Sequence, residues 1–320
     1  MGYRYFDDQR LWDLTVEVFT RNGYSRSDCE DIANVLLASD RMGIESHGVQ
    51  RMKLYTHSLE IGRIKRGAKS EIVRETPVSA VIDAHDAIGQ PVSVAAMQMA
   101  IDKAKKAGVG IVVVRDSNHY GIAGYYAKMA ADQGLLGISM TNTEALVVPT
   151  FGKQPMMGTN PIAVALPAEK HLPILLDMAT SRVSRGKLLV NMKKGEPVPD
   201  DWALAIDGSR TTDAPQAFRG ILLPLGYKGY GMAVIVDMLS RVLNGSGFGV
   251  AVDTPKDKPI VGSSFLAIKT EAFCEQGEFR RNVDALIDEI KNVKLEAGTD
   301  EVLMPGETEF RAEIANRKKG

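Results

Sequence analysis

The spacing of apolar residues changes along this chain, and the change limits the folds that it can adopt. Near the amino terminus, 7–22, 29–38 and 46–61 carry apolar residues at helical spacing. The middle alternates short apolar runs with helical patterns, and 278–293 is again an amphipathic helix. Further helices are predicted over 92–106, 123–132 and 229–243, and strands over 78–82, 111–114, 135–140, 162–166, 174–176 and 265–268.

This order of elements predicts an α/β (α+β) chain with a mixed sheet. Its 320 residues suit two domains, at about 150 residues each. We expect residues 1–74 and 276–320 to form a helical domain in which the terminal helices pack together. Residues 75–275 are expected to form an α/β domain. The sequence contains no internal repeat and no low-complexity segment that would argue for another division.

The charge balance argues against nucleic acid as a partner. With 39 basic and 40 acidic residues the net charge is −1, whereas proteins that track phosphates carry a basic excess. The longest apolar stretches, 109–114 and 232–236, are too short to cross a bilayer, and residues 1–10 show no apolar signal segment. Cys29 and Cys274 are far apart and have no metal-ligand spacing around them, which is typical of free thiols. We therefore expect a cytoplasmic protein without a metal site or a membrane partner.

Glycine makes up 30 of the 320 residues, above the average of roughly 7%. Many enzymes hold dinucleotides on a strand–GxGxxG–helix turn, but that motif is absent from this sequence. Gly108-Val-Gly110 precedes a predicted strand rather than a helix, and 245–249 has the wrong spacing. The Walker pattern of a phosphate loop is absent as well, so neither common nucleotide motif is present.

Three glycine-rich turns have polar side chains beside them, at 119–124, 158–161 and 226–231. The first lies between a predicted strand and a helix, the second precedes a strand, and the third opens a helix. Backbone N–H groups at the start of a helix attract anions. Each turn alone is better explained by a simple change of chain direction, but the three together favour a phosphate-bearing ligand.

Polar side chains line one face of the third predicted helix. If this helix begins at Ser46, then His47, Arg51 and Tyr55 lie at i, i+4 and i+8. A guanidinium can bind a carboxylate through two parallel hydrogen bonds, and a neighbouring imidazole can exchange a proton near neutral pH. The helix amino terminus and Arg51 would both keep His47 neutral. The alternative is a solvated helix face with Ser46 as its N-cap, which the spacing alone favours.

His119 follows a predicted strand and precedes a glycine-rich turn, a position that favours a functional site over a structural histidine. The remaining histidines have no supporting partners and are interpreted as surface or structural residues: His57, His85 and His171. A serine hydrolase fits poorly, because no G-x-S-x-G sequence occurs and neighbouring residues on a helix point about 100° apart.

A series of motifs runs in order along the whole chain. They are Gly43-Ile-Glu-Ser-His-Gly48 with Arg51 and Tyr55, Ser117-Asn-His-Tyr-Gly121, Thr141-Asn142, Gly158-Thr-Asn-Pro161, Asp177-Met-Ala-Thr-Ser181, Arg185-Gly-Lys187, Pro224-Leu-Gly226, Lys228-Gly-Tyr-Gly231 and Pro305-Gly-Glu307. On these motifs the chain resembles the type 2 malate/L-lactate dehydrogenases. That family also contains sulfolactate and ureidoglycolate dehydrogenases and 2,3-diketogulonate and cyclic-imine reductases.

The resemblance implies a homodimeric oxidoreductase that binds NAD, or alternatively NADP, on a non-Rossmann fold. His47 would be the acid/base that exchanges the hydroxyl proton, and Ser46 would orient it. In some members the histidine matching His119 is assigned this proton transfer, so His119 is the second candidate. The small anionic 2-hydroxy or 2-oxo acid would be bound by Arg51, which holds its carboxylate, and by Tyr55, Thr159 and Lys187.

The resemblance also assigns cofactor-binding positions. These are His119, Tyr120, Gly121, Ile122, Ala123, Asn142, Asn160, Asp177, Met178, Ala179, Tyr227, Lys228, Pro305, Gly306 and Glu307. The chain is shorter than its relatives within 218–228 and 245–262. Lys187 has the form found in hydroxy-acid dehydrogenases, which argues against an imine substrate.

The sequence therefore predicts an NAD(P)-dependent 2-hydroxy acid dehydrogenase, with malate as the expected substrate. The alternatives within enzymes are sulfolactate, lactate or ureidoglycolate dehydrogenase, and cyclic-imine or diketogulonate reductase. The alternative from another class is a nucleotide-binding protein without catalysis on the same scaffold. Retention of Ser46, His47, Arg51 and His119 argues against such a loss of activity.

Overall fold

The computed structural model describes residues 5–246 and 261–319. Its main sheet contains β1 (Glu71–Glu75), β2 (Ser79–Asp83), β3 (Val109–Ser117), β4 (Leu136–Thr141), β5 (Ile162–Leu166), β6 (Ile174–Met178) and β9 (Val261–Ile268). In the described part of the chain these seven strands lie in the order β1-β2-β3-β9-β4-β5-β6. β2 and β3 pair in parallel, whereas the other neighbouring pairs are antiparallel. The predicted α/β class with a mixed sheet is confirmed, and the pairing differs from the parallel sheet of a Rossmann fold.

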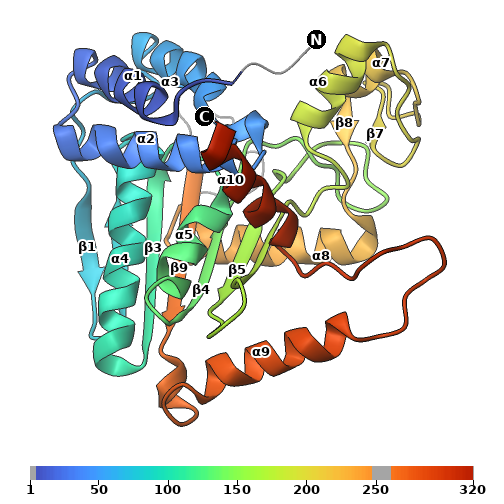
Figure 1. The fold of residues 1–320 in the computed structure, drawn as a ribbon. Helices are drawn as coiled ribbons and strands as arrows, with labels where there is room; N and C mark the ends of the chain where they lie inside the picture. The colour runs from blue at the N-terminus through green and yellow to red at the C-terminus, as the bar shows by residue number, and fades with distance from the viewer. Residues whose placement is uncertain (1–4, 247–260, 320) are drawn as a thin grey trace.

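The helices surround this sheet (Figure 1). Those that the apolar spacing predicts are α1 (Asp8–Arg21), α2 (Arg26–Arg41), α3 (Met52–Glu60), α4 (Gly89–Ala107), α5 (Ala123–Ala131), α8 (Gly226–Asp237) and α9 (Glu278–Lys291). Six further elements are not predicted by the apolar spacing: β1, α6 (Arg185–Lys194), β7 (Ala203–Leu204), α7 (Ala214–Arg219), β8 (Ile221–Leu222) and α10 (Glu307–Lys319). α8 continues as the π-helix Met238–Val242, so the predicted helix over 229–243 is one continuous rod with a local change of winding.

Helices pack on both faces of the sheet. Successive side chains of a strand point to opposite faces, and β9 illustrates this. The Phe265 ring contacts Tyr126 of α5, with the ring centroids 5.5 Å apart. The neighbouring Ser264 donates a hydrogen bond to the Leu239 carbonyl in the π-helix on the other face. α4 and α5 thus enclose the main core on one side, and α8 with the π-helix lies behind the sheet (Figure 1).

The terminal segments lie in two places. α10 packs on α2, where the Asn316 side-chain amide donates to the Arg41 carbonyl, and Phe310 joins the main core. α9 lies at the opposite end of the sheet from α1–α3 (Figure 1) and is held there by Asp284, which accepts backbone hydrogen bonds from residues 169–171. The division into a helical domain and an α/β domain stays a prediction.

α6, β7, α7 and β8 form a small lobe with its own apolar core, which includes Val183, Leu188 and Leu222. This lobe approaches the amino-terminal part of the chain, because a Cβ placed on Gly186 would lie 3.3 Å from the Ser46 Cβ. Of the two shortened segments, the first contains β8 and the start of α8, and most of the second lies outside the described residues. Within the described ranges, no helix combines the length and apolar composition needed to cross a membrane.

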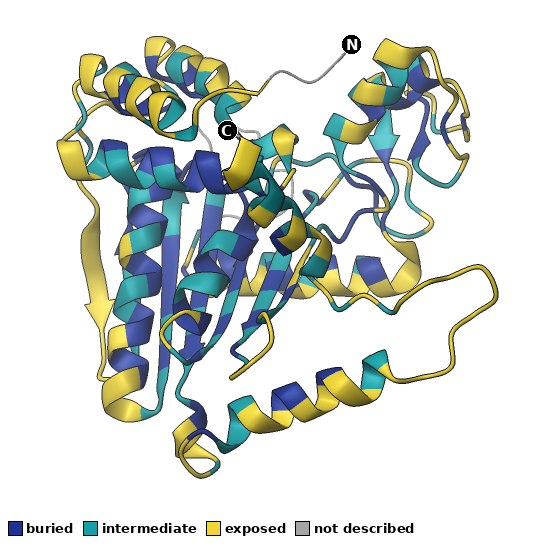
Figure 2. Ribbon diagram, viewed as in Figure 1, coloured by how far each residue is buried: buried dark blue, intermediate teal, exposed yellow. Residues whose placement is uncertain are grey.

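Burial follows these layers (Figure 2). The central strands and the inner faces of α2, α4 and α5 are buried, whereas β1 is exposed along its whole length. An edge strand that is exposed on both faces carries no alternating apolar pattern, which explains why the sequence analysis did not find it.

Candidate active site

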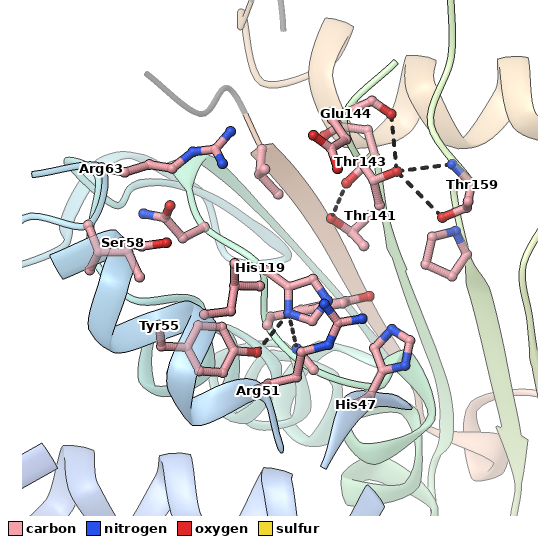
Figure 3. Close-up of a pocket in the computed structure, with 18 residues that line it drawn as sticks. His47, Arg51, Tyr55, Ser58, Arg63, His119, Thr141, Thr143, Glu144 and Thr159 are labelled. Carbon is pink, nitrogen blue, oxygen red and sulfur yellow. Dashed lines mark hydrogen bonds between the residues drawn. The ribbon is translucent and has the colours of Figure 1, made fainter. Parts of the chain in front are cut away.

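A cavity of about 210 Å³ opens between the amino-terminal helices and the carboxyl ends of β3 and β4 (Figure 3). Its walls come from α3 with the segments before and after it, the residues after β3, the end of β4 with the residues after it, the turn before β5, and the start of β9. Of the seven residues predicted to be catalytic or to bind substrate, five line this cavity. The predicted residues that line it are His47, Arg51, Tyr55, His119, Tyr120, Gly121, Asn142 and Thr159.

The backbone before α3 is not the regular helix that the spacing predicts. Residues Glu45–His47 and Val49–Arg51 form two 3₁₀ turns, and Gly48 between them has an extended conformation. Asp40 of α2 accepts a hydrogen bond from the Val49 N–H at 2.8 Å. A Cβ on Gly48 would lie 1.8 Å from the Asp40 carboxylate, so only glycine fits this turn. The prediction of one helix from Ser46, with Ser46 as its N-cap, is therefore wrong.

His47 is held by its neighbour in the sequence. The Ser46 hydroxyl lies 2.8 Å from Nδ1 of His47, and the Ser46 carbonyl accepts a hydrogen bond from Nε of Arg51 at 2.6 Å. Burial and, to a lesser extent, the Arg51 charge lower the pKa of His47 to about 4. The imidazole is thus neutral at physiological pH, as the sequence analysis expects. Burial is the main cause of the lowered pKa. The expected contribution of a helix amino terminus is absent, because no regular helix begins at this residue.

His119 lies beside His47, with the two rings stacked at a centroid distance of 5.4 Å. Its Nδ1 lies 2.7 Å from the Tyr55 hydroxyl and 3.3 Å from the Gly121 N–H. Because a backbone N–H can only donate, Nδ1 is an acceptor, and the proton of the neutral ring is on Nε2. Burial, followed by His47 and Arg51, holds the pKa of His119 well below its usual value. Tyr55, predicted to bind substrate, has its hydroxyl engaged with His119.

The opposite wall of the cavity carries hydroxyl and amide groups and one acid, Glu144 (Figure 3). Thr141 ends β4, and Asn142, Thr143 and Glu144 follow it. The Thr143 hydroxyl accepts a hydrogen bond from the Thr159 N–H at 3.0 Å, which joins this segment to the turn before β5. The Thr141 hydroxyl is engaged by the Gly262 carbonyl and the Ser263 hydroxyl. Thr143 and Thr159 supply hydroxyls on this wall that can both donate and accept hydrogen bonds.

The other predicted residues lie outside the cavity lining. Ile122 precedes α5 and Ala123 begins it, and both are buried. Buried Asn160 accepts from the Thr143 N–H and donates to the Ala233 carbonyl. The remaining ones are at β6, the start of α8, the start of α10 and the start of α6: Asp177, Met178, Ala179, Tyr227, Lys228, Pro305, Gly306, Glu307 and Lys187. Asp177 accepts from the Gly124 N–H at 2.7 Å, and the Pro305 carbonyl accepts from Leu175, so β6 connects α5 with α10. The roles of all these residues stay predictions.

Several lining residues were not predicted. Leu54 and Ser58 continue the helical face of Arg51 and Tyr55, so the same spacing argument could have found Ser58. Thr143 and Glu144 directly follow the Thr141-Asn142 motif in the sequence. Arg63 follows α3 in an irregular segment after Gly62, where no period applies. Among the described residues, no group of three His, Cys, Asp or Glu side chains is placed to hold a metal ion.

Comparison with known proteins extends this picture. Residues 6–320 match the model of the malate/L-lactate dehydrogenase family. The malate dehydrogenase of Pyrococcus abyssi is 44% identical over 310 residues, covering 94% of this chain and 85% of that protein. The L-sulfolactate dehydrogenase of Methanocaldococcus jannaschii is 41% identical over 311 residues, covering 96% and 89%.

The fold is also that of a solved relative. The crystal structure of malate dehydrogenase from Entamoeba histolytica superimposes with a TM-score of 0.95 at 32% identity, covering 100% of this chain and 93% of that chain. Fold, motifs and family model agree along almost the whole length. The chain therefore belongs to the malate/L-lactate dehydrogenase family.

Proposed function

We propose that this protein is an NAD(P)-dependent 2-hydroxy acid dehydrogenase that interconverts malate and oxaloacetate. One observation carries the proposal: two neutral histidines, His47 and His119, stack in one cavity beside the guanidinium of Arg51. Acid/base groups next to a carboxylate-binding group are what the interconversion of a hydroxyl and a carbonyl requires. Similarity to proteins named malate and L-sulfolactate dehydrogenase supports a 2-hydroxy acid as the substrate.

The residues present fit a nicotinamide cofactor. The carboxamide of nicotinamide needs both a donor and an acceptor, and Thr143 and Thr159 in the cavity wall provide hydroxyls that serve as either. When bound, the cofactor supplies the hydride chemistry, and the protein supplies binding and orientation. Relatives include enzymes named for NAD(+) and for NADP(+). We propose NAD as the cofactor, with NADP as the alternative, on a fold without the Rossmann pairing.

In this proposal Arg51 binds the substrate carboxylate. Its Nε is engaged by the Ser46 carbonyl, which fixes the plane of the guanidinium and leaves its two Nη groups for the ligand. His47, neutral and oriented by Ser46, takes the hydroxyl proton of the 2-hydroxy acid or returns it to the 2-oxo acid. His119 is the second candidate for this role, because the Tyr55 contact to Nδ1 leaves its Nε2 proton available for donation.

We further propose that the protein acts as a homodimer in the cytoplasm. An apolar face, called here the α8 face, runs along α8 and the π-helix and is exposed in the single chain. It consists of Leu225, Tyr227, Met232, Ile235, Met238, Leu239, Val242 and Leu243. Contiguous apolar surface of this kind marks protein interfaces, and the family resemblance implies a second copy as its partner. The free thiols of Cys29 and Cys274 suit a reducing compartment.

The test is a panel of substrates with both reduced cofactors. Absorbance at 340 nm should fall when the protein is mixed with NADH and oxaloacetate, and more slowly with other 2-oxo acids. A faster reaction than with oxaloacetate, observed with sulfopyruvate, pyruvate, a cyclic imine or diketogulonate, would indicate the corresponding alternative activity. Formation of NADH from NAD and ureidoglycolate would indicate a ureidoglycolate dehydrogenase. No absorbance change with any of them, together with measurable binding of NADH, would indicate a nucleotide-binding protein without catalysis.

A further inference from the structure

The cavity contains a second arginine that the proposed reaction does not use. Arg63 lines the same cavity as Arg51 but comes from the segment after α3 rather than from the turn before it. Among the lining residues that the structure describes, Glu144 is the one acid, and its side chain is exposed. The cavity is therefore suited to a ligand that carries more than one negative charge.

The backbone next to Arg63 is anchored, and one donor of the Arg63 guanidinium lacks a partner among the described residues. The Ile64 N–H donates to the Ser58 carbonyl at 3.0 Å, and Ile64 is buried, which anchors the backbone next to Arg63. Nε of Arg63 is buried and has no hydrogen-bond partner among the described residues. A buried donor without a partner costs free energy, and an oxyanion bound there would remove that cost.

The two arginines lie at different distances from the histidine pair: Arg51 lies beside both rings, and Arg63 lies beyond His119. Figure 3 shows Arg63 and Ser58 on one side of His119 and His47 on the other, with Arg51 between them. Ser58 is buried and its side chain lines the cavity, so its hydroxyl can serve the same ligand group as Arg63. A substrate whose carboxylate lies on Arg51 and whose reacting carbon lies at the histidines would extend its far end toward Arg63.

We propose that Arg63, assisted by Ser58, binds a second anionic group at the end of the substrate remote from the reacting carbon. This inference rests on the proposed function and narrows it: the enzyme selects four-carbon 2-oxo and 2-hydroxy acids with a terminal carboxylate, or three-carbon ones with a terminal sulfonate, over acids that end in a methyl group. Arg63 is thus a specificity-determining residue. Its loss removes the preference for a charged substrate without removing the reaction.

The experiment compares two substrates of equal chain length, oxaloacetate and 2-oxobutyrate, at saturating NADH. In 2-oxobutyrate a methyl group replaces the terminal carboxylate. In Arg63→Met the ratio of kcat/KM for oxaloacetate to kcat/KM for 2-oxobutyrate should fall roughly 10- to 100-fold, the effect expected for losing hydrogen bonds to a charged group. The value for 2-oxobutyrate itself should change by less than about threefold. Sulfopyruvate replaces oxaloacetate in a third arm, which tells the two terminal anions apart.

Two further variants keep the test decisive. Arg63→Lys retains the charge but not the planar donor pair, so it should recover part of the ratio. Ser58→Ala changes a small side chain and should lower the ratio by a few-fold even if Arg63→Met folds poorly. Arg66→Met serves as the matched control, because Arg66 is exposed nearby and does not line the cavity. Its ratio should equal that of the wild-type protein.

The outcomes separate the two claims. If the wild-type protein reduces neither acid, the proposed function fails, and this inference fails with it. If the wild-type protein is active but Arg63→Met and Ser58→Ala leave the ratio unchanged, the proposed function stands and the inference is overturned. An increase in the KM for NADH at a constant ratio would also overturn it, because Arg63 would then contact the cofactor instead of the substrate.

Discussion

The hydroxyl of Tyr55 lies 2.7 Å from Nδ1 of His119. Burial raises the pKa of this phenol far above its usual range, so Tyr55 remains protonated and donates the hydrogen bond. Together with the Gly121 N–H, it fixes His119 in the tautomer that carries its proton on Nε2. A tyrosine from α3 therefore determines how a histidine after β3 presents its proton to the cavity.

Replacing Tyr55 by Phe tests this relationship. The loss of one hydrogen bond, worth roughly 0.5–1.5 kcal/mol, should lower kcat by roughly 3- to 10-fold. The KM for malate should stay within about twofold of the wild-type value, since Arg51 still binds the carboxylate. Steady-state kinetics of malate oxidation measure both parameters. An unchanged kcat with an increased KM would instead place the Tyr55 hydroxyl on the substrate.

Arg51 should be sensitive even to a conservative change. Arg51→Lys keeps the charge, but it loses the paired donors and the Nε bond to the Ser46 carbonyl. We expect kcat/KM for malate to fall roughly 10- to 100-fold, mostly through KM, because hydrogen bonds to a charged group are worth roughly 1.5–3 kcal/mol. Arg66→Met, which removes an exposed charge outside the cavity, is the control. A KM for malate that stays within twofold in Arg51→Lys would exclude carboxylate binding by Arg51.

The turn at Gly48 should tolerate no side chain. Gly48→Ala places a Cβ 1.8 Å from the Asp40 carboxylate, so the two 3₁₀ turns must move apart. Overpacking of this kind costs roughly 1–3 kcal/mol, which for a chain of this size corresponds to a decrease in Tm of roughly 1–5 °C. The kcat should also fall at temperatures where the variant is still folded, because the same turn positions His47 and Arg51. Gly231→Ala, where the added Cβ meets no atom within 4 Å, should leave Tm unchanged or slightly higher. A normal Tm and kcat for Gly48→Ala would refute the role of this turn.

The α8 face can be tested without reference to catalysis. Ile235 is 59% exposed in the single chain and lies near the middle of this face. A charge at the centre of an apolar interface must be desolvated without a partner, so Ile235→Glu should shift the protein from dimer to monomer. Sedimentation or light scattering measures the change. Leu286→Glu on α9, at 49% exposure, is a matched substitution that should leave the mass unchanged. A wild-type protein that is already a monomer would contradict the proposed assembly.

Elements with a clear apolar period were predictable from the sequence. β3, β4 and β5 pack against buried helices on at least one side, and their apolar runs predict them within a few residues. α6 and α10 each bury a single residue, Leu188 and Phe310 respectively. The rest of each helix is mostly polar, so neither shows the apolar period that predicts a helix. The short strands β7 and β8 depend on contacts within the small lobe, and a two-residue strand carries no period of its own.

The candidate site was predictable in part of its residues but not in its backbone. The spacing of His47, Arg51 and Tyr55 predicts one shared face, and the family motifs assign that face to the site. The three residues line one cavity even though two 3₁₀ turns replace the expected helix. The turn at Gly48 depends on Asp40, a contact from another helix that local spacing cannot encode. The position of Arg63 likewise depends on how the segment after α3 returns to the cavity.

The most direct test of the central claim is the pH dependence of kcat/KM for malate oxidation, which reports the acid and base of the free enzyme. His47 must be neutral to accept the hydroxyl proton, and burial lowers its pKa from 6.5 to about 4. Activity should therefore persist as pH falls through 6.5 and should decline only as pH approaches about 4. His47→Asn should remove this acid limb and lower the rate by roughly 10²- to 10⁴-fold. A His47→Asn variant with a wild-type rate and an unchanged pH profile would contradict the account.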